Sequence, residues 1–423
     1  MRRVYKRLAC ASSQTSYPVV PSVFLLTLLL AACGGVSSRA TDSRVTNPQT
    51  SLSSANTSGA GGTTTGGVNN PSDGGVSGAN TITTATFLTV TSPTATNVPK
   101  GTTLAALAAQ LKLGTWAELK SQGFGPAILD DVNGSFIIQY TDDAQWDPVS
   151  KQVFFIGASY GFSSGAQRGN FIKYNDAANQ WTLMPRPVGP FPNLAHAYDH
   201  SALNPATGEF YHSLYNNRDI YKYNPAADSW SLLTTIPQSI MGGLQITKGL
   251  EYFPEMGGLV WYSSGVGLYF FNTSTKQWSV LADGLGTSTY HEFSEYDPVH
   301  KIVIFGGGDG SNAVFKLDAS GKVTQMKNAP VGLGITQSII TVDPVSGKFL
   351  VVTENKGLYE YDVVADTWRQ FNVPVPSGFF SVVIDGNPLQ GMFATPISTY
   401  GVVLFAKYNY DQSKVWIYKH SAP

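Results

Sequence analysis

The sequence predicts an all-β fold, a six-bladed β-propeller built from four-stranded antiparallel blades. A similar block of about 44 to 57 residues recurs six times along the chain. Most blocks end with an aromatic residue seven positions before a tryptophan, as in Tyr174 with Trp181, Tyr223 with Trp230, Phe271 with Trp278 and Tyr361 with Trp368. One four-stranded sheet cannot bury both of its faces, so blocks of this period are expected to stack around an axis.

The first 32 residues have the features of a targeting segment. Four basic residues near the start precede an apolar run over residues 23–32, which is followed by Cys33 and Gly34. The sequence Leu-Ala-Ala-Cys-Gly at positions 30–34 resembles the lipobox of bacterial lipoproteins. The resemblance implies that residues 1–32 are removed and that Cys33 is acylated. An ordinary secretory signal is the alternative.

Charge and cysteine content narrow the classes of partner. Removing the signal takes away four of the 27 basic residues and none of the 28 acidic ones, so 23 against 28 remain and the net charge becomes −5. This balance excludes nucleic acid as an expected partner. Cys10 lies in the removed segment, so only Cys33 would remain. We therefore expect no disulfide, no cysteine-based metal site and no cofactor.

Residues 33–95 predict a tether. Ser, Thr, Gly, Asn and Ala dominate this stretch, and it has too few large apolar groups to offset the entropy of ordering. It is expected to be disordered and to hold a monomeric head, residues 96–423, clear of a membrane. Gly34 is not the aspartate associated with inner-membrane retention, which favours the outer membrane within the cell envelope. A remnant with no spacing role is the alternative.

The elements of the head follow in order. Residues 104–112 have the composition of a short helix. Each block then begins with a strand that ends in an Asp-Pro-like turn. The proline marks the end of this strand, because it cannot donate a backbone hydrogen bond to a neighbouring strand. The clear copies have their prolines at Pro148, Pro205, Pro254, Pro298 and Pro344, and residues 385–388 form a looser sixth copy. Three further strands are expected in a block: an apolar second strand, a third strand that carries the aromatic residue, and a fourth strand near the tryptophan.

The last block lacks a fourth strand. It has apolar segments at residues 401–406 and 415–418, but the chain ends five residues later. Residues 115–119, which include Trp116, are expected to supply the missing strand and to close the ring, which removes exposed sheet edges. Seven blades are possible if residues 127–138 contain extra strands.

These repeats resemble the kelch family of propellers. The resemblance rests on the four-stranded block, on the aromatic residue before the tryptophan, and on a glycine run after a second strand at Gly306, Gly307 and Gly308. It implies a propeller that serves either as an enzyme or as a binding platform, so it does not determine the function. The galactose-oxidase type of kelch enzyme needs a cysteine cross-linked to a tyrosine, and the head has no cysteine.

Polar residues recur near the start of the innermost strands. The positions seven and six residues before the five prolines are all polar. They include the candidate ligand-binding residues Thr141, Asp142, Tyr198, Asp199, Thr247, Lys248, His291, Glu292 and Gln337. A polar ring is what a solvated channel mouth requires, and we expect it to bind a glycan or a protein partner. A water-filled channel without a ligand is the alternative.

The same region contains candidate acid–base residues: His196, Tyr198, His200, Tyr290 and His291. Alternation along one strand would place the first three on one face. Similar His and Tyr groups act in propeller polysaccharide lyases, which implies a carbohydrate-active enzyme, a lyase or a sugar isomerase, as the alternative function. Lys248 or Arg168 would then neutralise a uronic carboxylate. A metal site is not expected, because two histidines four residues apart on a strand are about 13 Å apart.

Overall fold

The computed structural model describes residues 103–131, 136–158, 169–186, 194, 196–241, 248–263, 265–285, 290–380, 387–409 and 412–421. The predicted signal segment, Cys33 and the tether lie outside these residues, as do Thr247 and Arg168. In the described part of the chain, no helix is long and apolar enough to cross a membrane.

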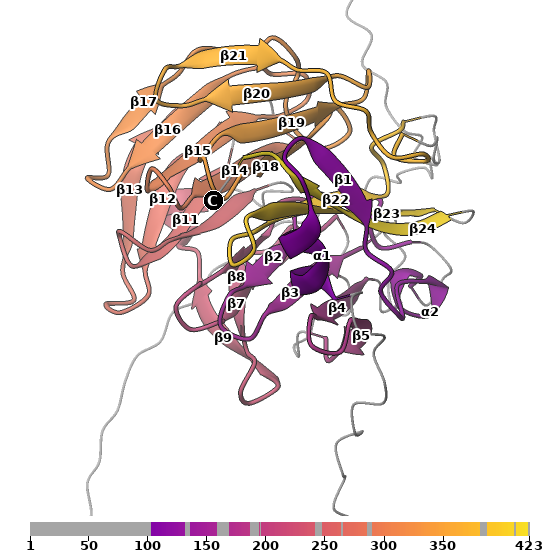
Figure 1. The fold of residues 1–423 in the computed structure, drawn as a ribbon. Coiled ribbons are helices and arrows are strands. Elements are labelled where there is room, and N and C mark those ends of the chain that lie inside the picture. The colour runs from indigo at the N-terminus through magenta and orange to yellow at the C-terminus, as the bar shows by residue number, and fades with distance from the viewer. Residues whose placement is uncertain are drawn as a thin grey trace, which may run out of the picture. The chain divides into compact units, whose positions relative to one another are not determined.

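The described strands form six four-stranded antiparallel sheets, which confirms the predicted six-bladed propeller (Figure 1). In each of the first five blades the strands follow one another in chain order. Blade 1 contains β2 (Gln145–Asp147), β3 (Gln152–Gly157), β4 (Asn170–Asn175) and β5 (Gln180–Met184). Blade 2 contains β6 (Ser201–Leu203), β7 (Phe210–Ser213), β8 (Asp219–Asn224) and β9 (Ser229–Thr235). Blade 3 contains β10 (Gly249–Phe253), β11 (Gly258–Ser263), β12 (Gly267–Asn272) and β13 (Trp278–Asp283).

The second half of the ring repeats this order. Blade 4 contains β14 (Glu292–Asp297), β15 (Ile302–Gly307), β16 (Val314–Asp318) and β17 (Val323–Gln325). Blade 5 contains β18 (Ser338–Val342), β19 (Phe349–Thr353), β20 (Leu358–Asp362) and β21 (Thr367–Gln370). Blade 6 contains β22 (Met392–Ile397), β23 (Val402–Asn409), β24 (Gln412–Lys419) and β1 (Thr115–Glu118). The prediction that residues 385–388 form the turn at the end of an innermost strand is wrong, because β22 ends later, at Ile397.

Blade 6 is closed by the N-terminal strand, as predicted. β1 pairs antiparallel with β24, and Trp116 lies opposite Tyr418 with their rings stacked at 4.5 Å. Figure 1 shows indigo β1 beside the yellow C-terminal strands. Residues 127–138 add no blade among the described strands, because α2 (Pro126–Leu129) occupies the start of this segment.

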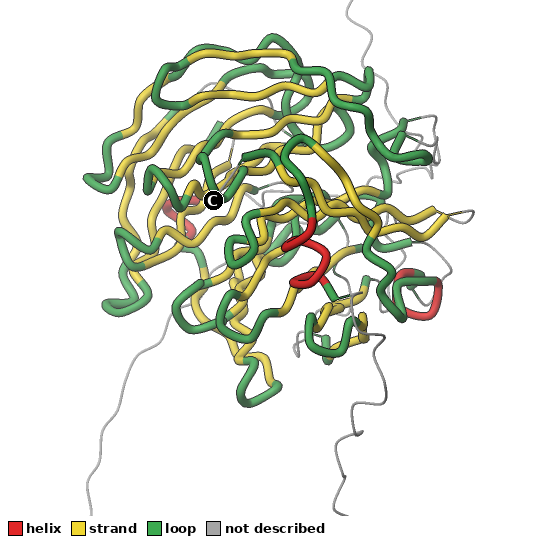
Figure 2. The backbone as a smooth tube through the Cα atoms, viewed as in Figure 1, coloured by secondary structure: helices red, strands yellow, loops and turns green. Residues whose placement is uncertain are grey.

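Strands dominate the described chain, and its three helices are short (Figure 2). The predicted helix over residues 104–112 is α1 (Leu104–Gln110), capped by the Thr103 side chain. Leu104 and Ala108 of α1 are buried in the same apolar cluster as residues of blades 1 and 6. The third helix, α3 (Gln238–Met241), lies between blades 2 and 3 in the sequence.

The repeated tyrosine and tryptophan form a cross-strand pair at the outer edge of a blade. Tyr174 lies opposite Trp181 with ring centroids 5.3 Å apart, and its hydroxyl donates to Asn179 Oδ1 at 2.9 Å. Asn179 has a φ of 48°, which an asparagine tolerates better than most residues. The seven-residue spacing therefore encodes a tight hairpin turn, and the hydroxyl stabilises this turn in the blades where the aromatic residue is a tyrosine.

The indole of each repeat tryptophan also donates a hydrogen bond, either to the preceding blade or to the segment that follows that blade. The four Nε1 donors pair as follows: Trp181 with Ser121 Oγ, Trp230 with the Pro185 carbonyl, Trp278 with Thr234 Oγ1, and Trp368 with the Lys327 carbonyl. The interior between blades is apolar and aromatic, and one cluster joins Phe154 and Phe171 of blade 1 to Phe210 of blade 2. The repeat tryptophan thus makes contacts both within its own blade and with the preceding blade.

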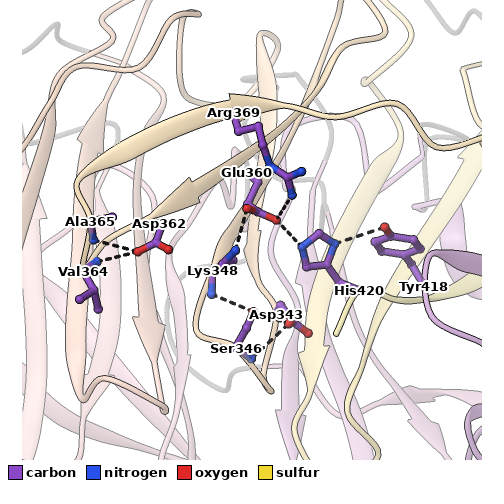
Figure 3. A network of polar contacts seen from close by, with 10 residues as sticks. All are labelled: Asp343, Ser346, Lys348, Glu360, Asp362, Val364, Ala365, Arg369, Tyr418 and His420. Atoms are coloured by element: carbon purple, nitrogen blue, oxygen red, sulfur yellow. Dashed lines mark hydrogen bonds and ion pairs between the residues drawn. The ribbon is translucent and has the colours of Figure 1, made fainter. Parts of the chain in front are cut away.

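A polar network joins blades 5 and 6 where the chain ends. Glu360 of β20 accepts hydrogen bonds from Lys348 Nζ at 2.9 Å, Arg369 Nη2 at 3.0 Å and His420 Nε2 at 2.6 Å (Figure 3). Burial favours the neutral form of Glu360, but these three partners outweigh it and lower the pKa of Glu360 to about 2. The residue after β24 is therefore held to the neighbouring blade by a charged carboxylate.

Candidate functional site

Histidines and tyrosines gather where the innermost strands of blades 2 and 4 begin. We call this set the entrance cluster: Tyr140, His196, Tyr198, Tyr215, Tyr290 and His291. His291 directly precedes β14, and Tyr198 lies three residues before β6. The structure thus brings the candidate residues His196, Tyr198, Tyr290 and His291 together through ring contacts.

The backbone that carries this cluster is irregular, and the predicted strand over residues 196–200 is wrong. β6 begins only at Ser201, and φ is positive at His196 (52°), Tyr198 (31°) and His291 (68°). Such angles are uncommon for bulky residues and are often found at functional sites. The side chains are therefore brought together by turns and not by alternation along a strand.

Ring contacts connect the members of the cluster. The His196 ring stacks on Tyr140, with centroids 4.8 Å apart and 7° between their planes. Its Nδ1 is hydrogen-bonded to the Tyr198 hydroxyl. The Tyr198 ring lies 5.3 Å from that of His291, whose Nδ1 is 2.9 Å from Asp309 Oδ1. Tyr290 has 38% of its surface exposed, so the cluster reaches solvent at this residue.

Burial keeps the imidazoles of the cluster neutral at pH 7. It lowers the pKa of His196 to about 4, with a smaller contribution from His291. Burial also lowers the pKa of His291, although Asp309 acts in the opposite direction. The pKa of the Tyr198 phenol is raised, mainly by burial. A neutral imidazole offers one donor and one acceptor, which suits hydroxyl recognition.

Two candidate residues lie deeper than expected. His200 is fully buried, with its ring 5.6 Å from that of Tyr198 and 6.3 Å from that of His212. Lys248 is fully buried, and its ammonium donates to Ser213 Oγ at 3.1 Å, to the Leu214 carbonyl at 2.7 Å and to the Asn217 carbonyl at 2.6 Å. All three donors of Lys248 are used inside the protein, so it does not line a solvated mouth.

The remaining members of the predicted ring differ in burial. Thr141 and Glu292 are buried, whereas Asp142 and Gln337 are half-buried. Asp199 is buried and accepts hydrogen bonds from the backbone and the hydroxyl of Ser294. Among the described residues near the ring, Tyr290 is exposed and His291 is half-buried, whereas Tyr198 and His196 are buried.

A second constellation lies toward the other end of the innermost strands. A cavity of about 270 Å³ opens there, next to the turns that contain Pro148, Pro205, Pro254 and Pro298. Its walls include the carboxylates of Asp143, Glu251 and Glu295. These three residues were not singled out from the sequence. The signal was available, since Glu251 and Glu295 both lie three residues before a proline, at the same register of two neighbouring blades.

The cavity carboxyls are poorly solvated. Burial raises the pKa of Glu251 to about 8 against hydrogen bonds from the backbone N–H groups of Tyr252 and Tyr296. Burial, followed by the charges of neighbouring carboxyls, holds the pKa values of Asp143, Asp199 and Glu295 well above their usual range. Among the residues that the structure describes, no three His, Asp or Glu side chains are arranged to hold a metal ion.

Comparisons with known proteins reveal likeness of fold alone. No protein-family model and no curated protein matches the chain. A Bacteroides thetaiotaomicron protein of unknown function, solved at 1.70 Å, is similar at a TM-score of 0.46 and 14% identity, over 74% of this chain and 73% of that one. A fungal alcohol oxidase of the AA5 family, in complex with copper, has a TM-score of 0.44 and 12% identity over 67% of this chain. This chain covers 62% of the oxidase.

The class of protein that these observations define is a six-bladed β-propeller. Its distinguishing features are an aromatic and histidine cluster at one end of the innermost strands and a carboxylate cavity at the other.

Proposed function

We propose that this protein is a binding protein of the bacterial cell envelope that recognises a glycan at the entrance cluster. The observation that carries the proposal is the exposed ring of Tyr290 beside His291, with a ring separation of 6.2 Å. Exposed aromatic rings stack on the apolar faces of sugars, and neighbouring polar groups bond to the hydroxyls. Here His291 and Asp309, whose side chains are 19% and 39% exposed, supply those polar groups.

Attachment to a membrane is part of the same proposal. The Leu-Ala-Ala-Cys-Gly sequence supports acylation of Cys33, and the Ser/Thr/Gly-rich residues 33–95 support a flexible tether. A lipid-anchored head at the outer membrane would meet polysaccharides of the envelope or of the surroundings. A protein ligand at the same cluster is the competing outcome of the binding test.

The binding test uses the full chain in detergent and a panel of neutral and anionic polysaccharides. We expect saturable binding to at least one member, and a loss of affinity of about tenfold in Tyr290→Ala, because stacking on an aromatic side chain contributes on the order of 1–3 kcal/mol where it has been measured for nucleic-acid bases. Val364→Ala, at a residue 73% exposed in the turn between β20 and β21, is the control and should bind normally. Failure of the whole panel to bind would overturn the glycan proposal and favour a protein ligand.

A lyase is the second candidate, and one observation favours it. The neutral His196 imidazole is hydrogen-bonded to the Tyr198 hydroxyl, which is the arrangement of a base beside a phenol that can donate a proton. The cation expected beside the substrate carboxylate is not supplied by Lys248, which is consumed by internal hydrogen bonds. Ultraviolet absorbance of unsaturated uronic ends, lost in Tyr198→Phe, would establish this activity. Its absence with every anionic polysaccharide would exclude it.

A further inference from the structure

The cavity at the proline end of the innermost strands combines acidic groups with an apolar wall. Asp143, just ahead of β2 in blade 1, contributes one carboxyl group, and Glu251 of blade 3 and Glu295 of blade 4 contribute two more. The same cavity has hydrocarbon and aromatic surface from Trp146, Leu203 and Tyr296. A site of this composition suits a molecule with a positive charge at one end and hydrocarbon at the other.

Thr395 adds an independent indication of a ligand. Its side chain lines the cavity and is 1% exposed, and its Oγ1 has no hydrogen-bond partner among the described residues. Buried hydroxyl groups without a partner are costly and are rare in native structures. An N–H donor within the cavity would provide that partner, because a hydroxyl oxygen can accept.

The carboxyl groups also require a cation if they are to ionise together. Asp142 raises the pKa values of Asp143 and Glu295, and the three cavity carboxyls raise the pKa of Asp199, so five acidic groups share one poorly solvated region. Like charges at short range cannot all ionise in such a region, and an opposite charge between them favours the ionised forms. Hydrogen bonds from backbone N–H groups already hold Glu251 in place, so the site is formed before any ligand arrives.

We propose that this cavity binds a small primary alkylammonium ion, whose ammonium group donates to Glu251, Glu295 and Thr395 and whose hydrocarbon lies against Trp146 and Leu203. A primary ammonium has three N–H donors and no acceptor, which matches three oxygen acceptors. The volume of about 270 Å³ is slightly below the usual range for small-molecule sites, about 300–1,000 Å³, and favours a small amine. The site is separate from the entrance cluster, since the two lie at opposite ends of the innermost strands.

Isothermal titration calorimetry of the full chain in detergent with n-butylammonium tests this proposal. We expect saturable binding that is at least tenfold weaker in the double variant Glu251→Gln, Glu295→Gln. Glu354→Gln, which removes an exposed carboxylate elsewhere, should bind as the original protein does. Because binding ionises carboxyl groups that are partly protonated at pH 7, titrations in buffers of different ionisation enthalpy should reveal proton release.

A variant at Thr395 and an uncharged ligand test the hydroxyl and the charge separately. Thr395→Val retains every charge and removes one acceptor, so it should weaken binding several-fold even if the double variant fails to fold. n-Butanol carries the same hydrocarbon without charge and should not bind. Equal binding of butanol, equal weakening in Glu354→Gln, binding of Mg²⁺ in place of butylammonium, or an unchanged affinity in Thr395→Val would each overturn the proposal.

Discussion

The indole Nε1 of Trp181 donates a hydrogen bond to Ser121 Oγ at 3.1 Å, across the boundary between the first and last blades. Ser121 follows β1, the strand from the N-terminal part of the chain that completes blade 6. Two main-chain hydrogen bonds, both 2.9 Å, support the same boundary: Gln122 N–H to the Asn179 carbonyl, and Trp181 N–H to the Gln122 carbonyl. The tryptophan that marks a repeat in the sequence thus also stabilises the closure of the ring.

Ser121→Ala is therefore expected to destabilise the propeller by about 1–3 kcal/mol, because it leaves a buried indole N–H without its acceptor. Urea unfolding followed by tryptophan fluorescence measures this change. Ser274→Ala, in an exposed turn, should change the free energy of unfolding by less than about 0.5 kcal/mol. In a double-mutant cycle, Ser121→Ala should cost almost nothing in a Trp181→Phe background. Additive losses would show that the hydrogen bond contributes little.

Glu360→Gln is expected to reduce stability at neutral pH and to have less effect in acid. The folded-state pKa of Glu360, about 2, lies below its ordinary value of 4.5, so its ionisation stabilises the fold above pH 4.5. This contribution is lost as the pH falls from 4.5 toward 2. The difference in free energy of unfolding between the two proteins should therefore shrink between pH 6 and pH 3. A difference that stays constant over this range would contradict the role assigned to the charge.

Lys248→Met tests the cost of a buried ammonium. Burial lowers the pKa of Lys248 to about 7 from 10.5, so between these values the unfolded chain binds a proton that the folded protein does not. The stability of the original protein should consequently gain a rising contribution from pH 7 to pH 10, and the variant should lack it. Lys356→Met, at an exposed lysine, should retain the rise. Identical pH profiles for all three proteins would contradict the prediction.

Cys33→Ala is expected to release the protein from the membrane fraction of expressing cells, because the proposed acyl chain would have no attachment site. Fractionation and metabolic labelling with a fatty acid measure this outcome. Cys10→Ala is a matched control, since Cys10 lies in the segment proposed to be removed, and it should remain membrane-bound and labelled. Fatty-acid labelling that persists in Cys33→Ala would show that the lipid is attached to a residue other than Cys33.

Much of the fold was predictable because its signals are local. The tyrosine and tryptophan seven residues apart encode a hairpin whose turn, pairing and hydroxyl bond all lie within one short segment. The missing fourth strand of the last block, together with Trp116 near the other end of the head, was sufficient to predict the closure by β1. The prediction of a strand-ending turn at residues 385–388 was wrong because the proline pattern of the other blades does not hold in blade 6. The innermost strand of that blade ends at Ile397 and is followed by Ser398.

The sequence alone predicted six blades, with seven left open, together with the order of their strands. Only the tertiary structure decided which polar residues face solvent. Lys248 and His291 belong to neighbouring blades of the predicted ring, yet one is sealed by hydrogen bonds from its own ammonium and the other lies beside exposed Tyr290. The cavity of Asp143, Glu251 and Glu295 likewise depends on strands from separate blades meeting at the axis. Repeat periodicity is a local property of the chain, whereas burial and charge proximity arise only when distant repeats pack around a common centre.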